Sequence, residues 1–172
     1  MLKTILILMA ITSLPAFELR ASIPYAILGG TVPLPMGWSV QGMQLPWPTA
    51  FAVCTLANIL LGILVYPAVH YGFHLMAHIP LLGQTYRWWQ GHVQRKLTPA
   101  VEKWGTWGLA VFIAVPLPGS GTYSGAVGAS LLGISFRPFV IANTLGVTIA
   151  GIIVTAMTVS GQNLWDFFTK LN

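Results

Sequence analysis

The sequence predicts an all-α integral membrane protein, built as an inverted repeat of a re-entrant helical hairpin plus a transmembrane helix, with an amphipathic cytoplasmic connector. The chain of 172 residues is 55% hydrophobic and only 6% charged, whereas a soluble domain carries about 25% charged residues. Long apolar runs alternate with shorter runs that proline, glycine or charged residues interrupt. The seven tryptophans flank these runs, as aromatic residues at membrane interfaces do. We therefore expect a single membrane domain over residues 1–172.

The first predicted hairpin occupies residues 1–37 and is broken by a polar pair. Its first apolar run meets Pro15, Glu18 and Arg20 before it reaches the roughly 20 residues that a spanning helix needs. After the polar pair the chain is apolar again, and Pro24 stands near the start of this second run, where a helix tolerates proline. Two half-length helices around a polar break are typical of a re-entrant hairpin.

A cleavable signal peptide is the alternative for this segment. Cleavage after Ala16 or Ala21 would place Leu14 or Leu19 three residues before the cut, where signal peptides carry a small residue. The hairpin is therefore the favoured interpretation.

Residues 47–78 form the longest apolar segment and are predicted to be a transmembrane helix. The preceding stretch, Pro33–Pro48, is rich in proline and glycine, which indicates an external loop. Near the end of the helix, His70, His74 and His78 recur every four residues and share one face. No carboxylate is near them in sequence to complete a metal site. We predict no metal and interpret them as a histidine stripe at the cytoplasmic end.

The next segment, residues 79–106, is basic and aromatic. It carries the cations Arg87, Arg95, Lys96 and Lys103 among tryptophans and aliphatic residues. This composition is typical of an amphipathic helix on the membrane surface, and its positive charge marks the cytoplasmic side. A plain basic linker is the alternative and gives the same orientation.

A second hairpin is predicted over residues 107–136 and a second transmembrane helix over residues 137–160. Pro116, Pro118 and three glycines interrupt the hairpin, because they remove backbone donors or adopt conformations that a straight helix cannot use. In lipid, such a break must be covered by protein or by a water-filled cavity. The break is therefore a candidate site, and residues 161–172 after the last helix are predicted to be an interfacial tail.

The order of these segments predicts the topology in the cell (inner or plasma) membrane. One crossing, residues 47–78, separates the two hairpins, so they are expected to enter from opposite faces with their tips near the midplane. With the connector in the cytoplasm, both termini fall on the outer side. A chain this short is also expected to form a homodimer, because its rows of small residues let helices of two copies pack closely.

Ionisable side chains at membrane depth are the first functional candidates, because each costs about 2.5–3.5 kcal/mol to insert. Glu18 is the candidate for proton coupling, and Arg20 and Arg137 are candidates for binding an anionic headgroup. In the structural alternative, Glu18 pairs with one of these arginines, and Arg137 reaches toward the cytoplasmic interface.

The break in the second hairpin supplies hydroxyl and backbone groups instead of charge. The candidate substrate-binding residues there are Gly119, Ser120, Gly121, Thr122 and Tyr123. The N-terminus of the returning half-helix adds N–H groups that favour an anion. Gly121, Gly125 and Ala129 also form a row of small residues, which helix packing alone would explain.

Enzyme chemistry is not expected from this sequence. It contains no Cys/His dyad, Walker loop, carboxylate pair or zinc motif of ordinary composition, so no catalytic residue and no cofactor are predicted. No nucleic-acid partner is expected either, because the net charge of +5 rests on few residues, several of them in one segment.

Four stretches of the chain carry more specific motifs. In chain order they are Glu18-Leu19-Arg20-Ala21-Ser22-Ile23-Pro24, the run PLPGSGTYSGA from Pro116 to Ala126, Ser130-Leu131-Leu132-Gly133, and Leu145-Gly146-Val147 with Ala150 to Val154. Together these stretches resemble the small multidrug export protein family over nearly the whole chain. The fold is similar to that of the wider DedA-like (SNARE-associated, VTT) membrane proteins, which have two opposed re-entrant hairpins.

This resemblance implies a transporter. DedA-like relatives are linked to moving polyprenyl-phosphate or other lipids, and by analogy Glu18 couples protons while Arg20 and Arg137 bind phosphate. We predict transport of an anionic amphiphile such as a polyprenyl-phosphate across the bilayer, with membrane lipids and this substrate as partners. The alternatives are export of small drug-like molecules and a non-transporting protein that organises the membrane.

Overall fold

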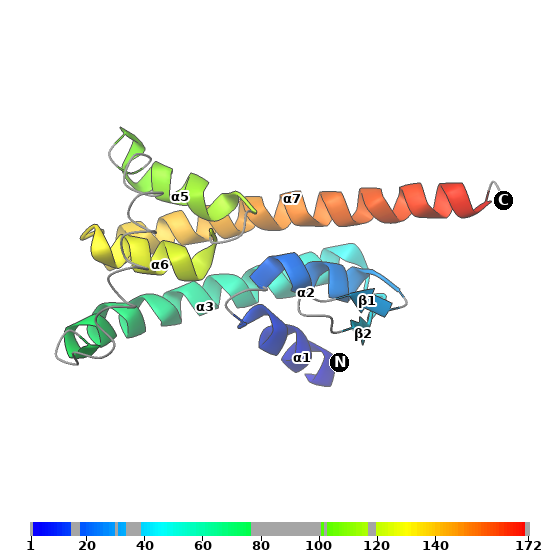
Figure 1. Cartoon of the computed structure of the whole chain (residues 1–172), viewed down its shortest axis with the longest axis horizontal. Helices are drawn as coiled ribbons and strands as arrows, with labels where there is room; N and C mark the ends of the chain where they lie inside the picture. The colour runs from blue at the N-terminus through cyan, green and yellow to red at the C-terminus, as the bar shows by residue number, and fades with distance from the viewer. Residues whose placement is uncertain are drawn as a thin grey trace. The chain divides into compact units, whose positions relative to one another are not determined.

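The computed structural model describes the backbone of residues 2–14, 18–29, 31–33, 39–76, 101, 103–116 and 120–170. The elements are α1 (Leu2–Thr12), α2 (Glu18–Ile27), β1 (Thr31–Pro33), β2 (Ser39–Gln41), α3 (Trp47–Met76), α5 (Thr106–Ala114), α6 (Thr122–Leu131) and α7 (Phe136–Lys170). Figure 1 labels them along the chain. The predicted helical fold is therefore present, with one short strand pair in addition. Most of the predicted connector lies outside the described residues, as do Pro15, Pro118 and Gly119.

Among the described residues, two helices are long and apolar enough to cross a membrane. The qualifying stretches are Trp47–Gly72 in α3 and Phe136–Gly161 in α7, each of 26 residues. Only 28% of the most apolar window of α3 is buried inside the protein. The exposed side chains include Leu56, Leu60 and Leu64, which are spaced four residues apart on one face. A continuous exposed leucine face suits contact with lipid and not with water.

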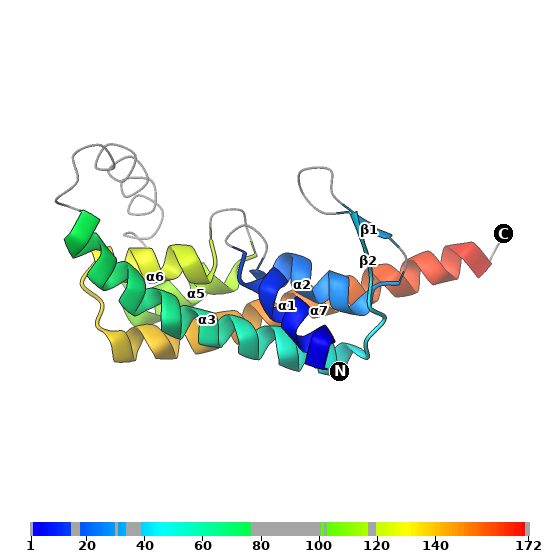
Figure 2. The same cartoon turned by 90° about the horizontal axis from the view of Figure 1, so that it is seen from below.

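Helix α7 is longer than the sequence pattern predicts. The pattern ends the helix at residue 160 and adds a separate tail, whereas α7 continues without interruption to Lys170 (Figures 1 and 2). The extra segment contains no proline, so no backbone donor is missing. Its one glycine, Gly161, costs a helix only about 1 kcal/mol. Polar composition alone therefore did not end the helix.

The chain divides into two compact units. Unit 1 comprises residues 1–58 and 149–172, and unit 2 comprises residues 59–148. Each unit contains one pair of short helices in mutual contact, α1 with α2 in unit 1 and α5 with α6 in unit 2. Each also contains one part of α3 and one part of α7. The two units are thus assembled from the same kinds of parts.

In unit 1, helix α2 is almost enclosed, since eight of its ten residues are buried. Figure 2 shows the antiparallel pair β1–β2 as a small hairpin. The chain after β2 then returns to α2. The Met43 N–H donates to the Tyr25 carbonyl at 3.0 Å, and the Leu45 N–H donates to the Ala26 carbonyl at 2.8 Å. The segment predicted as an external loop therefore contains strand β2 and anchors the end of α2.

In unit 2, small residues let the helices approach closely. A Cβ atom added at Gly125 of α6 would lie 2.6 Å from a side-chain carbon of Ile113 in α5. A Cβ added at Gly146 of α7 would lie 2.7 Å from the carbonyl oxygen of Ala110. Both separations are shorter than packed atoms tolerate. The packing explanation for the predicted row of small residues therefore holds at Gly125, and Gly146 of α7 allows a close approach in the same way.

Helices α3 and α7 meet in unit 2 through polar and aromatic contacts. Asn143 is fully buried, and its Nδ2 donates to the Ile59 carbonyl at 3.2 Å. Gly62 leaves room for this amide, because a Cβ at that position would overlap it. Tyr66 stacks on Phe139 with ring centroids 4.7 Å apart. These contacts pack the two helices against each other in unit 2.

Helix α6 ends in a glycine cap. Gly133 has φ of 69°, in the left-handed region that glycine adopts most readily. The Ile134 N–H donates to the Ala129 carbonyl at 2.9 Å, and the Gly133 N–H donates to the Ser130 carbonyl at 3.4 Å. This pair of bonds is the Schellman pattern. It satisfies the last carbonyls of α6 within the protein.

Candidate functional site

The turn from α1 to α2 places an acidic side chain inside unit 1. Glu18 is the first residue of α2, is 7% exposed and has φ of 42°. A residue with a Cβ adopts this left-handed conformation at a cost of about 1–3 kcal/mol. Strained residues of this kind are concentrated at functional sites. Sequence reasoning identified the acid but had no signal for its backbone conformation.

Arg20 lies half-buried on the same helix and interacts electrostatically with Glu18. Arg20 and Pro24 are the two α2 residues outside its buried set, and they are one turn apart on one face. Pro24 has no N–H, so it cannot donate to the Arg20 carbonyl as a helix residue normally does. The less covered face of α2 therefore carries the cation Arg20, and on the same face Pro24 leaves one helical hydrogen bond unformed.

The predicted start of the second half-helix near Pro24 is wrong. Helix α2 begins at Glu18, so both members of the polar pair lie within its first turn and Pro24 lies in its interior. An acidic first residue suits the positive end of the helix dipole, which explains the earlier start.

A hydrogen bond within the first turn of α2 is buried beside α3 in unit 1. The Ser22 Oγ donates to the Glu18 carbonyl at 2.9 Å. The Ser22 side chain lies beside the thiol of Cys54 on α3. Glu18, Ser22 and Cys54 are all buried.

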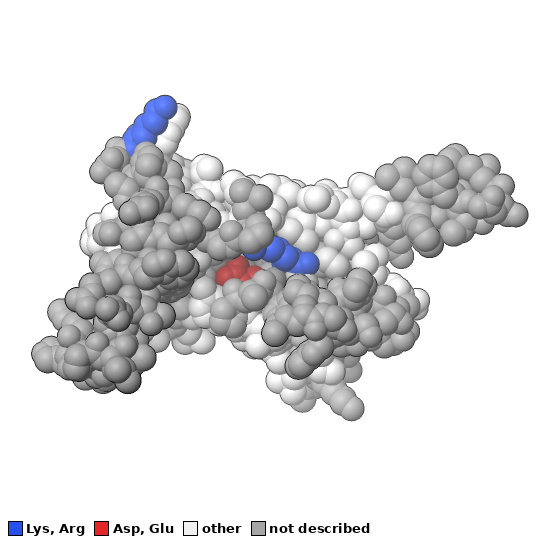
Figure 3. All heavy atoms as spheres, in the orientation of Figure 1, with Lys and Arg blue, Asp and Glu red and all other residues white. Residues whose placement is uncertain are grey.

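Charge is scarce among the side chains that the structure describes. Glu18 is the only acidic one, and the basic ones are Arg20, Lys103 and Arg137. Figure 3 shows one face, on which red acidic atoms lie beside blue basic ones in a described surface that is otherwise largely white. A charge in apolar surroundings is retained when it pairs with an opposite charge or has a functional role. The interaction of Glu18 with Arg20 is compatible with both the pairing interpretation and a functional role.

The second helix break lies between α5 and α6 in unit 2. The Ser120 hydroxyl donates to the carbonyl of Val115, the C-cap residue of α5. Gly121 has φ of 112° and ψ of −168°, a conformation that is essentially restricted to glycine. Helix α6 starts directly afterwards, so Thr122 and Tyr123 lie in its first turn. Thr122 is fully buried and Tyr123 is half-buried.

Arg137 lies in the first turn of α7 and is exposed. This position agrees with a side chain that reaches toward the membrane interface. Glu18 and Arg20 belong to unit 1, while Arg137 and the second break belong to unit 2. Each unit therefore contributes its own part of the predicted site residues.

His70 has a structural contact that the sequence did not predict. Its Nδ1 lies 3.1 Å from the Ser130 Oγ of α6, and its ring stacks on Tyr66 with centroids 5.7 Å apart. The described residues contain no group of three or more potential metal ligands. The side chains of His74 and His78 lie outside the described part of the chain.

Comparison with protein families identifies the chain. The family model described as "Putative small multi-drug export protein" matches residues 18–153. The chain belongs to this family. The match to the small multi-drug export family begins at Glu18, the first residue of α2, and ends within α7, so it starts directly after the first helix break and contains the second. The comparisons with curated proteins and with solved structures gave no match.

Proposed function

We propose that this member of the small multi-drug export family is a transporter that exports small amphiphilic molecules. The observation that carries the proposal is the start of α2, where buried Glu18 and half-buried Arg20 interact within a largely apolar helix pair. A membrane protein retains charged side chains inside the bilayer when they have a functional role, because inserting them costs free energy. The strained backbone of Glu18 supports the same interpretation.

Short helices support a re-entrant arrangement as part of this proposal. Helices α1, α2, α5 and α6 have 11, 10, 9 and 10 residues. At 1.5 Å per residue each reaches about half of a 30 Å hydrocarbon core. Within the described part of the chain, one membrane-length helix, α3, separates the two pairs. Re-entrant pairs on either side of one crossing open to opposite faces, which is the inverted repeat of many transporters and of the DedA-like proteins.

The charge of Glu18 defines the substrate class in this proposal. A carboxylate in a poorly hydrated position attracts a cationic amphiphile and releases it when the carboxylate takes up a proton. Competition between proton and substrate for one carboxylate couples export to proton entry. The family description, which names export of drugs, agrees with a small-molecule substrate.

Arg20 favours a second candidate function, the movement of a lipid phosphate. A guanidinium binds phosphate through two parallel hydrogen bonds, and Arg20 lies on the less covered face of α2. Under this alternative a polyprenyl-phosphate is the substrate, and Glu18 orients the arginine.

Proteoliposomes with an imposed pH gradient separate these candidates. We expect the wild-type chain to transport the cationic dye ethidium faster than empty liposomes do. Glu18→Gln should reduce this transport to the rate of empty liposomes, because the variant can no longer exchange a proton for the dye. Glu102→Gln is the control, since it makes the same substitution in the predicted connector.

Other outcomes of the same assay decide against this mechanism. Dye transport that persists in Glu18→Gln rules out coupling through this carboxylate. Flipping of a fluorescent polyprenyl-phosphate that Arg20→Gln abolishes would favour the lipid substrate. Movement of neither probe by the wild-type protein contradicts transport and leaves the membrane-organising alternative.

A further inference from the structure

A groove lies between the first turns of α5 and the first turns of α7 within unit 2. Its volume is about 250 Å³, and its walls include Thr106, Trp107, Ala110, Pro138, Ile141 and Leu145. The two helices touch at Gly146, where an added Cβ would lie 2.7 Å from the Ala110 carbonyl oxygen. The groove therefore lies between this contact and the first residues of both helices.

The walls of this groove include exposed apolar side chains. Trp107 is 65% exposed and Ile141 is 57% exposed. Ile141 and Leu145 belong to the stretch of α7 that is long and apolar enough to cross a membrane. Apolar side chains that are exposed on such a helix contact acyl chains in a bilayer. The groove is therefore open to lipid.

The polar part of the groove is at one end. Thr106, the first residue of α5, supplies the one hydroxyl among the described lining side chains. The walls farther along both helices, at Ala110 and Leu145, are apolar. Leu145 lies eight residues after Arg137, or about 12 Å along the axis of α7. This order suits an amphiphile whose polar head lies at the helix starts and whose chain follows the groove.

Two exposed cations adjoin this polar end. Lys103 comes shortly before α5, and Arg137 is the second residue of α7. The Lys103 Nζ lies 5.5 Å from the centroid of the Trp104 ring, and basic and aromatic side chains are both typical of a membrane interface. The described side chains of unit 2 include no acidic one, and Glu102 lies outside them. The polar end of the groove therefore favours a negatively charged group.

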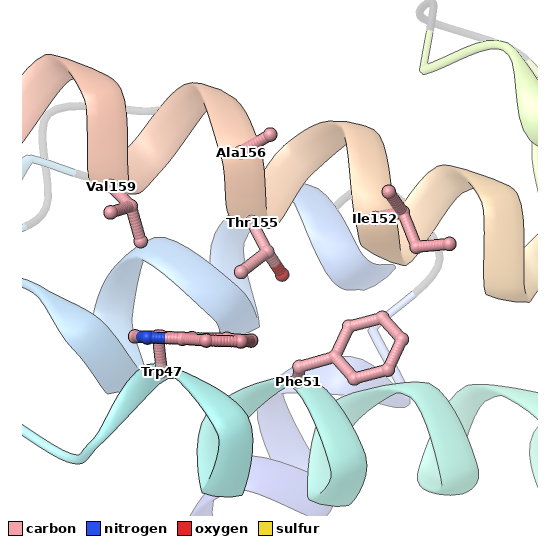
Figure 4. A pocket seen from close by; sticks show the side chains of 6 residues that line it. All are labelled: Trp47, Phe51, Ile152, Thr155, Ala156 and Val159. Atoms are coloured by element: carbon pink, nitrogen blue, oxygen red, sulfur yellow. The ribbon is translucent and has the colours of Figure 1, made fainter.

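A second groove, between α3 and α7 in unit 1, lacks this combination. Figure 4 labels the six side chains that line it, and none of them is charged. The sequence places no charged residue close to them either. Apolar walls alone accept any apolar occupant. The groove of unit 2 is more selective, because cations adjoin one of its ends.

We propose that the groove of unit 2 holds an acyl chain of an anionic phospholipid, whose phosphate Lys103 and Arg137 attract. Basic residues between helices at the cytoplasmic side of a membrane bind anionic headgroups in this way, and the charge pattern predicts these helix starts on that side. The lipid is a resident ligand of unit 2 and not the molecule proposed to be transported at Glu18 and Arg20. Arg137 therefore serves this lipid and not the transported substrate.

Native mass spectrometry of the full chain tests this site. The protein is released from detergent that contains equal amounts of phosphatidylglycerol and phosphatidylcholine with the same acyl chains. We expect the first retained lipid to be phosphatidylglycerol. Lys103→Gln and Arg137→Gln should each lower this preference about fivefold, the contribution of one basic residue near an anionic surface. Arg20→Gln is the matched control, because it removes a cation from unit 1, and it should keep the preference.

A second pair of variants tests whether an acyl chain occupies the groove. Ile141→Trp enlarges a wall of the groove and should abolish retention of the first phosphatidylglycerol. Ile149→Trp should keep it, because Ile149 is an exposed residue of α7 that does not line the groove. Circular dichroism checks that both variants remain helical.

Several outcomes of these measurements would overturn the proposal. The first is equal retention of the two lipids by the wild-type protein. The second is a preference that Arg20→Gln removes and Arg137→Gln keeps, because the lipid would then lie at the proposed transport site. Retention that survives Ile141→Trp would exclude the groove. Displacement of the lipid by glycerophosphoglycerol, the headgroup without acyl chains, would show that the cations bind a phosphate alone.

Discussion

The short helix pairs of units 1 and 2 resume after their breaks in different ways. In unit 1, helix α2 begins at a buried acid, Glu18, whose φ is 42°. In unit 2, helix α6 begins after Gly121, whose φ is 112°, and the Ser120 hydroxyl satisfies a carbonyl of the break. A glycine accepts such a conformation at little steric cost, whereas glutamate does not. The start of α2 in unit 1 therefore carries a charged side chain and a strained backbone, whereas the start of α6 in unit 2 follows a glycine that accepts its backbone conformation without strain.

The contacts between α3 and α7 also differ between the two units. In unit 2 these helices are joined by the Asn143 hydrogen bond and by the stacked rings of Tyr66 and Phe139. In unit 1 the contact at Gly151 is followed by an apolar groove that Trp47 and Phe51 of α3 line. Unit 2 contains a groove of its own, of about 250 Å³, between α5 and α7, so cavities occur in both units.

Gly121→Ala should have the largest effect on the free energy of unfolding. Its φ and ψ lie in a region almost closed to other residues, and strain of this kind costs about 1–3 kcal/mol. The control is Gly72→Ala in α3, where an added Cβ meets nothing within 4 Å. This control should be neutral or stabilising, because alanine is the better helix former. Denaturant unfolding in detergent measures both, and equal effects would show that the break in unit 2 is not closed by its glycine.

Gly146→Ala should destabilise the protein more than Gly151→Ala. The new Cβ at Gly146 would meet the backbone oxygen of Ala110, whereas the one at Gly151 would meet the Thr55 side chain, which can rotate away. Overpacking typically costs about 1–3 kcal/mol, and we expect Gly146→Ala near the top of this range and Gly151→Ala near its lower end. Adding Thr55→Ala should rescue Gly151→Ala. The same unfolding assay measures both single variants. Equal losses of unfolding free energy would show that the helix contacts at Gly146 and Gly151 are equally rigid.

Gly133→Ala should have a smaller effect than Gly121→Ala and Gly146→Ala. Alanine in the left-handed cap of α6 costs about 1–2 kcal/mol at most, and Gly133→Asn should cost less, because asparagine tolerates this conformation. Thermal unfolding in detergent checks the order of the three proteins. If alanine and asparagine behave alike, the end of α6 is held by other contacts, as the end of α2 is held by Met43 and Leu45.

Composition and local pattern determined the class of the protein. A chain with 6% charged residues cannot cover itself in water, and runs of about 20 apolar residues identify spanning helices from length alone. The prolines and glycines near residue 120 indicated the second break, because the backbone angles that these residues allow do not depend on tertiary contacts. The motifs at Glu18 and Pro116 indicated the family, which the match over residues 18–153 confirms.

The tertiary structure decided the features that depend on residues far apart in sequence. Glu18 adopts a left-handed backbone in a buried helix turn, where the Ser22 hydroxyl donates to its carbonyl and lies beside Cys54 of α3. The groove of unit 1 depends on how closely Gly151 brings α7 to Thr55. Local sequence specifies which segments are helical and which face is apolar, but not which side chains of two helices lie opposite each other. That choice follows from packing between helices, where the lack of a single Cβ sets their separation.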